Sequence, residues 1–326
     1  MRIDSCRTPL TPGTSRSHDF CSPTLGGPFE DFWHLDSLHS LIANPAVFEL
    51  LLLVVGAVAG VIGAILGLGG GIVIIPVLTL LFGINIRYAV GASIVSVIAT
   101  SSGAAATYVK DRITNIRVAM LLEVGTTIGA FAGAMLTTMI STDQLFLLFA
   151  VILLYSGVAM VRGRKPQDLG HEVRAPDPLA TRLRLNASYP DALLQREVAY
   201  QVYQVPLGLA LMLGAGLISA LLGIGSGVLK VPAMDQAMKL PIKVSSATSN
   251  FMMGVTAAAS AGAYFMRGWI LPSLAAPVAV GVVLGAWLGS WLMMRMSSAR
   301  IRKYFVVVII VVAAQMLLRG LNLKLG

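Results

Sequence analysis

The chain has 326 residues, of which 56% are hydrophobic and 12% are charged, and its formal net charge is +9. A soluble domain usually carries about twice that share of charged residues, so the composition excludes an ordinary soluble domain and predicts an integral membrane protein. The basic residues fall mainly between apolar stretches, as in membrane proteins generally, so the positive charge does not indicate a nucleic-acid partner.

Polar and apolar residues alternate in long blocks, which predict the domain organisation. The polar N-terminal tail contains Cys6 and Cys21, which could pair in an oxidising compartment, and an aromatic segment around Trp33, which could lie in the membrane interface. The expected parts are the tail at 1–45, a first transmembrane repeat at 46–161, a basic linker at 162–203, a second transmembrane repeat at 204–320 and a C-terminal tail at 321–326.

The apolar sequence predicts five helices in each half. They cover residues 46–66, 71–83, 87–109, 116–139 and 143–161, and then 206–224, 227–239, 243–266, 270–295 and 299–319. About 20 apolar residues are enough to cross a bilayer, but the second helix of each half is shorter and could instead dip into the membrane and return. The expected fold is an all-α membrane protein with about ten transmembrane helices.

The two halves are an internal duplication without a gap. When the sequence is shifted by 156 positions, residues 63–76 fall on residues 219–232, and Ser93 and Thr100 fall on Ser249 and Thr256. A duplicated, strongly apolar sequence that is broken by glycine is typical of a secondary transporter.

The loop charges indicate how the two repeats are oriented. The loop after the third helix is basic in the first half, with Lys110, Arg112 and Arg117, whereas its counterpart has only Arg267; the loop after the fourth helix shows the opposite pattern. Equivalent loops therefore prefer opposite sides, which favours two inverted five-helix repeats over parallel four-span repeats. The basic linker predicts a cytoplasmic central loop and external termini for a protein of the cell inner membrane.

Two glycine runs interrupt the apolar sequence at equivalent positions. Each run precedes a predicted helix start, where unpaired N–H groups and the helix dipole attract anions. We expect broken helices at the repeat interface, with an anion site at Gly69, Gly70, Gly71, Gly225, Ser226 and Gly227. The alternative is that the small residues only allow close helix packing.

The first run has the pattern G-x-G-G-G-x-x-x-x-P, and the next helix opens with Val90-Gly91-Ala92-Ser93; a weaker copy in the second half ends in Ser246-Ala247-Thr248-Ser249-Asn250. Over residues 46–320 this resembles the TauE/SafE family of sulfite and organosulfonate exporters. The resemblance implies ten helices in two inverted halves and transport of small sulfur-containing anions. The second run departs from the pattern at Ser226 and Lys230, which leaves the exact substrate open.

Polar side chains in the predicted helices are further candidates for the substrate site. The side chains of Ser93, Ser249 and Asn250 could hydrogen-bond the oxygens of an oxyanion, or they could only link helices. Lys230 follows Ser226 by four residues on the same helix face and could bind the anion, or its side chain could extend to the membrane interface.

Two acidic residues in the predicted helices are candidates for ion coupling. An ionisable side chain is costly in lipid, so Glu123 and Asp235 should each face a cavity or a charged partner. Glu123 could carry a coupling proton, or it could pair with Arg117 or another base near a helix end.

The sequence indicates a transporter rather than an enzyme. All four histidines lie in the tail or the linker. The apolar segments therefore lack the histidine that a serine–histidine hydrolase or a histidine metal site would need. We expect no catalytic residue, metal or cofactor. The expected function is export of sulfite, sulfoacetate or another organosulfonate, with the lipid bilayer as the other partner. A passive anion channel and a transporter of another small carboxylate or oxyanion remain alternatives.

Overall fold

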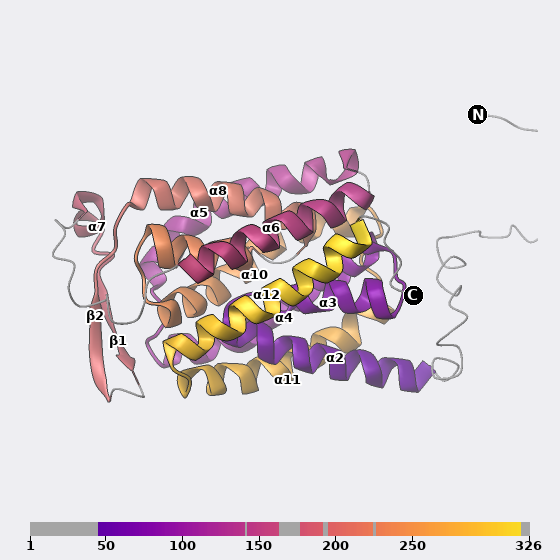
Figure 1. Cartoon of the computed structure of the whole chain (residues 1–326), viewed down its shortest axis with the longest axis horizontal. Helices are drawn as coiled ribbons and strands as arrows, with labels where there is room; N and C mark the ends of the chain where they lie inside the picture. The colour runs from indigo at the N-terminus through magenta and orange to yellow at the C-terminus, as the bar shows by residue number, and fades with distance from the viewer. Residues whose placement is uncertain (1–44, 141, 163–176, 192–194, 224–225, 321–326) are drawn as a thin grey trace, which may run out of the picture. The chain divides into compact units, whose positions relative to one another are not determined.

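The computed structural model describes residues 45–140, 142–162, 177–191, 195–223 and 226–320, all within one compact unit (Figure 1). The expected interfacial segment around Trp33, the two cysteines and Gly225 lie outside these residues.

The helices repeat with the spacing of the sequence duplication. The first half contains α2 (Pro45–Leu66), α3 (Gly71–Pro76), the π-helix η2 (Val77–Leu81), α4 (Ile86–Lys110), α5 (Ile116–Leu136), the 3₁₀-helix η3 (Thr137–Met139) and α6 (Thr142–Arg162). The second half contains α8 (Val205–Leu222), α9 (Gly227–Pro232), the π-helix η5 (Ala233–Ala237), α10 (Ile242–Met266), α11 (Pro272–Met294) and α12 (Ser298–Gly320). From α3 onward, every counterpart in the second half starts 156 residues later.

The linker between the halves contains folded elements that the sequence analysis did not predict. The short helix α7 (Pro178–Arg182) precedes strands β1 (Ala187–Asp191) and β2 (Arg196–Tyr200), which form an antiparallel hairpin with Tyr189 opposite Val198. Tyr189 and Tyr200 are buried in a hydrophobic cluster that also includes Leu240. The hairpin is a departure from the expected all-α fold, and it arises because these strand-forming residues pack against the helices.

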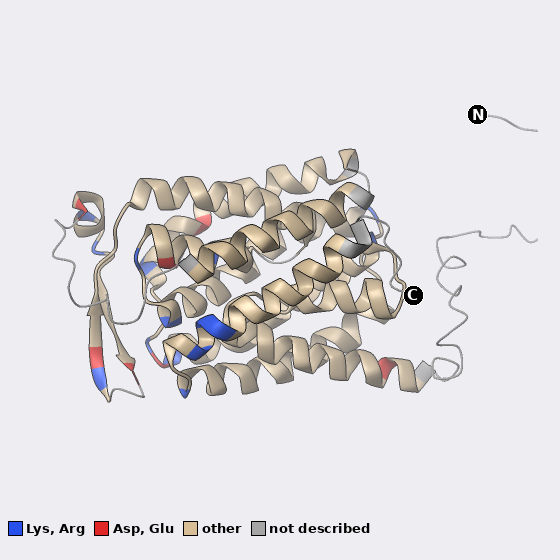
Figure 2. Ribbon diagram, viewed as in Figure 1, with Lys and Arg blue, Asp and Glu red and all other residues tan. Residues whose placement is uncertain are grey.

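The helices are long and apolar enough for a membrane protein. Among the described residues, six meet the length and composition of a membrane span: Ala46–Leu66, Ile86–Lys110, Ile116–Leu136, Gln144–Val161, Val205–Leu222 and Pro272–Met294. The apolar segment Gly71–Leu81 is shorter and rises only about 17 Å. Figure 2 shows ribbons that are mostly uncharged, with Lys, Arg, Asp and Glu gathered mainly near the helix ends.

The helix contacts follow the duplication as well. Helix α2 packs along α11, and their counterparts α8 and α5 pack along each other; α4 packs against its own counterpart α10, and α6 against α12. Glycines allow these close approaches, because a Cβ on Gly285 would lie 2.0 Å from the carbonyl oxygen of Ala57, and a Cβ on Gly129 would lie 2.0 Å from that of Leu213. These two contacts are equivalent in the two halves.

Candidate functional site

The backbone between α2 and α3 is broken by glycines in the left-handed conformation. Helix α2 ends at Leu66, and Gly67, Gly69 and Gly70 have φ angles of +71°, +77° and +70°, a region that side chains with a Cβ rarely adopt. The break between α8 and α9 is similar, with φ angles of +64° at Gly223 and +56° at Ser226. The expected helix break is therefore present in the first glycine run. In the second run it is present at Gly223 and Ser226, the described residues on either side of 224–225.

The two breaks lie against each other. A Cβ on Gly227 would lie 2.0 Å from the carbonyl oxygen of Gly67, and a Cβ on Gly71 would lie 3.2 Å from the carbonyl oxygen of Gly223. These are the same two positions in each repeat. Backbone therefore meets backbone where the chain passes from one broken helix to the next, and a larger residue than glycine does not fit at Gly227.

A serine from each half closes the break of the other half. The hydroxyl of Ser93 on α4 donates to the carbonyl oxygen of Gly223 at 2.6 Å, and the hydroxyl of Ser249 on α10 donates to that of Gly67 at 2.9 Å. A helix end leaves carbonyl groups without a partner in the helix, and a buried carbonyl without a hydrogen bond is costly. The two serines satisfy this requirement reciprocally.

Buried tyrosines complete the arrangement from within each half. The hydroxyl of Tyr108 donates to the carbonyl oxygen of Ala64 at 2.9 Å, and that of Tyr264 donates to the carbonyl oxygen of Ala220 at 2.8 Å. Both tyrosines are buried, and both pairs occupy equivalent positions in the two repeats. The last turn of each broken helix is thus held by one tyrosine and one serine.

Asn250 also contacts the end of α2. Its side-chain NH₂ donates to the carbonyl oxygens of Ala64 at 2.8 Å and Ser246 at 3.1 Å, while its Oδ1 has no partner among the described residues. Of the predicted anion-binding polar residues, Ser93, Ser249 and Asn250 therefore all direct donors at backbone carbonyls. In this conformation they hold the broken helices.

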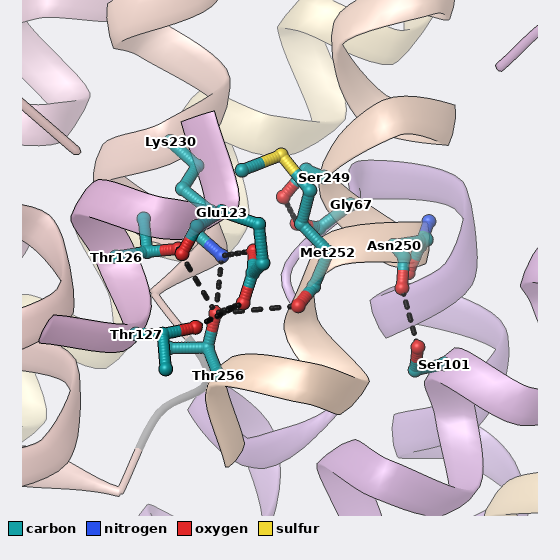
Figure 3. A network of polar contacts seen from close by, with 10 residues as sticks. All are labelled: Gly67, Ser101, Glu123, Thr126, Thr127, Lys230, Ser249, Asn250, Met252 and Thr256. Carbon is teal, nitrogen blue, oxygen red and sulfur yellow. Dashed lines mark hydrogen bonds and ion pairs between the residues drawn. The ribbon is translucent and has the colours of Figure 1, made fainter. Parts of the chain in front are cut away.

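Lys230 and Glu123 form a buried ion pair beside the second break (Figure 3). The Nζ of Lys230, on α9, lies 3.3 Å from Oε2 of Glu123 on α5 and donates to Oγ1 of Thr256 on α10 at 2.6 Å. Lys230 is fully buried and Glu123 is 9% exposed. The alternative that the Lys230 side chain extends to the membrane interface is therefore wrong.

Threonine hydroxyls surround the carboxylate of Glu123. The hydroxyl of Thr256 lies 2.7 Å and that of Thr127 lies 3.3 Å from Oε1. Glu123 therefore pairs with a base, as one alternative expected, but the base is Lys230 and not Arg117, whose guanidinium donates to the carbonyl oxygen of Arg184. Thr127 was not singled out from the sequence, whereas Thr256 stood out as the counterpart of Thr100 in the duplication and as one of several hydroxyl-bearing candidates on its helix.

The ion pair joins the two halves, and it occurs at only one of two equivalent places. The residues equivalent to Lys230 and Glu123 are Ile74 and Ala279, which are apolar. The hydroxyl of Thr100, the counterpart of Thr256, lies 2.8 Å from the carbonyl oxygen of Ser96 and 3.2 Å from that of Gly69. The same fold is therefore built with and without the buried charges, which are costly in an apolar interior.

Asp235 has a different partner from Glu123. Both of its carboxylate oxygens lie within 3.0 Å of Nη2 of Arg302, so the pair connects η5 to α12. The predicted ionisable residues thus do not come together in one cluster: Lys230 and Glu123 pair with each other, and Asp235 pairs with a residue that the sequence analysis did not single out.

A second polar cluster lies at the hairpin. Lys243 at the start of α10 donates to both carboxylate oxygens of Asp191, at 3.0 and 3.1 Å, beside a cavity of about 460 Å³. Asn115 donates to the phenolic oxygen of Tyr200, and burial raises the pKa of Tyr200 to about 12. Among the described residues, no group of three or more His, Cys, Asp or Glu side chains could hold a metal ion.

Comparisons with known proteins find a matching family and several related membrane transporters. The family described as "Sulfite exporter TauE/SafE" matches residues 52–316. The "Probable membrane transporter protein YunE" of Bacillus subtilis is 25% identical over 278 residues, which cover 83% of this chain and 98% of that protein. A "Probable membrane transporter protein" of Xylella fastidiosa is 26% identical over 276 residues, covering 83% of this chain and 96% of that protein. No solved structure matches the chain.

The serine that closes the first break gives a prediction about stability. Ser249→Ala leaves the buried carbonyl of Gly67 without this hydrogen bond, so we expect the free energy of unfolding to fall by about 1–3 kcal/mol. Ser102→Ala is the matched control, because Ser102 is exposed on α4 and donates only to Ile98 of its own helix. Thermal unfolding of both purified variants in detergent tests this, and equal midpoints would contradict a structural role of Ser249 at the break.

Proposed function

Because the chain belongs to the TauE/SafE family, we propose that it is a secondary transporter that exports a small sulfur-containing anion across the cytoplasmic membrane. The substrate is sulfite, sulfoacetate or another organosulfonate. The observation that carries the proposal is the pair of broken helices in mutual contact, with a fully buried lysine on the helix that follows the second break. Broken helices and an intramembrane cation are features with which transporters bind anions.

The transporter has ten helices in two inverted repeats. The contact of α2 with α11 has an equivalent in the contact of their counterparts, α8 and α5. Such paired contacts are expected when a two-fold axis relates the two repeats. Inversion is supported by the opposite directions of α2 and α8, and by the start of α2 and the end of α12, which lie away from the hairpin in Figure 1. The basic linker faces the cytoplasm and the termini face outward.

The anion binds beside the contact between the breaks. The starts of α3 and α9, near Gly71 and Gly227, supply the positive ends of two helices, and Gly69, Gly70 and Ser226 shape the approach. Lys230 supplies the positive charge. Ser93, Ser249 and Asn250 take a supporting role, since their donors hold the carbonyls of the broken helices.

The close contact of the breaks favours a carrier over a passive channel. Gly227 touches Gly67, and the hydroxyl of Ser93 would lie 2.3 Å from a Cβ on Gly71, so the backbone leaves little room between the breaks in this conformation. An anion passes only if the two halves shift relative to each other. Such a rearrangement is the alternating access of secondary transporters, and it predicts saturable transport.

Transport by the purified protein in liposomes tests the function. We expect saturable uptake, accelerated by the same anion on the opposite side, for at least one of sulfite, methanesulfonate, sulfoacetate, taurine, thiosulfate and sulfate. Gly227→Ala should abolish uptake because its Cβ meets the carbonyl oxygen of Gly67, whereas Gly214→Ala on α8, with open space around it, should transport normally. Uptake that never saturates would indicate a channel, and no uptake of any of these anions would overturn the proposal.

The topology can be tested on the full-length chain. In a variant with Cys6→Ser and Cys21→Ser, a single cysteine is introduced as Arg182→Cys in the linker or as Lys324→Cys near the C-terminus. An impermeant maleimide should label the first only in inside-out vesicles and the second from outside intact cells, because an odd number of helices separates them. Labelling of both positions from one side would rule out the inverted ten-helix arrangement.

A further inference from the structure

The contacts of the Glu123 carboxylate resemble those of a bound oxyanion. Its two oxygens receive an ammonium at 3.3 Å from Lys230 and hydroxyls at 2.7 Å from Thr256 and 3.3 Å from Thr127. A cation together with hydroxyl donors is also what a sulfite or sulfonate group requires, since its charge is likewise spread over oxygen atoms. A side chain of the protein therefore occupies the place where the proposed substrate would find its best partners.

We infer that Glu123 is a built-in competitor of the substrate: the anion replaces its carboxylate on Lys230 and Thr256, and Glu123 takes up one proton in exchange. The inference rests on the proposed function and specifies how that transporter is coupled. One proton then travels with each monovalent anion.

The duplication supplies the argument that the pair serves transport rather than folding. The equivalent positions hold Ile74 on α3 and Ala279 on α11. These helices, the counterparts of α9 and α5, form without a charge at those positions. A buried ion pair gains little stability over apolar side chains of similar volume. Its presence in only one of two matching environments therefore calls for a functional reason.

Glu123 must bind a proton when an anion occupies Lys230, because no other cation among the described residues contacts its carboxylate. Helix α8 carries no titratable side chain. On α10, Lys243 pairs with Asp191, and the hydroxyl of Tyr264 donates to Ala220. On α5 itself, Arg117 donates to Arg184. Among the described residues, Lys230 is thus the cation that contacts Glu123, and without it the buried carboxylate would keep only hydroxyl partners. A buried carboxylate without a counter-charge is neutralised by a proton instead.

The charges balance in this exchange. Before binding, the ammonium of Lys230 and the carboxylate of Glu123 sum to zero. After binding, Lys230 pairs with the anion, and Glu123 is a neutral acid whose proton came from the water on the side of entry. The net charge of the site stays at zero, so transport of a monovalent anion is electroneutral. Export then requires an outward anion gradient larger than the opposing proton gradient.

Methanesulfonate is the probe for coupling, because it is the anion of a strong acid and carries no proton of its own. Wild-type protein in liposomes that contain a pH-sensitive dye should move one proton with each methanesulfonate, at a rate independent of an imposed membrane potential. Its apparent affinity should rise about tenfold for each unit by which the pH falls, since one proton is bound with the anion. If the carrier takes sulfite but rejects methanesulfonate, the proton count is made in alkaline buffer, where sulfite is a dianion without a proton of its own. One proton per sulfite is then still expected, but each cycle moves one net negative charge, so the rate should depend on the membrane potential.

Glu123→Gln isolates the proton step, because an amide resembles the neutral acid in shape and cannot ionise. This variant should bind and exchange the anion with an affinity that no longer depends on pH, and it should move no protons. The double variant Lys230→Ile with Glu123→Ala reproduces the residues of the equivalent place, Ile74 and Ala279. It should unfold at a temperature close to that of the wild type and bind no anion, which separates loss of the site from loss of the fold.

The results separate the proton coupling from the transport function itself. Saturable methanesulfonate transport without proton movement, or an unchanged pH dependence in Glu123→Gln, would overturn the coupling and leave the transporter intact. Anion binding by the double variant would likewise overturn the role of Lys230. Failure of the wild type to move any sulfur oxyanion would instead overturn the proposed function itself.

Discussion

The structure depends on one constraint: two helices are broken in an apolar interior, and the backbone groups that the breaks release must find hydrogen bonds without water. The hydroxyls of Ser93 and Ser249 satisfy the carbonyls of Gly223 and Gly67 across the two halves. Neither half closes its own break alone. This reciprocal dependence explains why the breaks lie together, why the contacting positions are glycines, and why the duplicated halves form one unit.

The symmetric scaffold contains an asymmetric centre. The glycine contacts, the serine hydrogen bonds and the buried tyrosines occur in both halves, whereas the Lys230–Glu123 pair occurs once. A symmetric frame can exchange two similar conformations with little change in energy, which suits a carrier that opens to either side in turn. A single ion pair beside the breaks then gives this carrier one binding charge and one exchangeable proton.

Features with a local or periodic signal were predictable from the sequence. The helices, the duplication and the starts at Gly71 and Gly227 follow from apolar length and glycine spacing, and membership of the family is confirmed. The partner of Glu123 was not predictable, because Lys230 lies 107 residues away and its counterpart Ile74 gives no hint of a charge. The hairpin was missed because the linker was interpreted by its charge alone, whereas tertiary packing of Tyr189 and Tyr200 stabilises its strands.

The central claim is that an oxyanion replaces the carboxylate of Glu123 on Lys230. Crystals of the protein with selenite, a heavier analogue of sulfite, test it directly, since anomalous scattering locates selenium without prior assumptions. The account predicts one selenium peak beside Nζ of Lys230 and Oγ1 of Thr256, with the Glu123 carboxylate displaced. A selenium peak at another place, such as the cavity beside Lys243 and Asp191, with the Lys230–Glu123 pair intact at 3.3 Å, would contradict it.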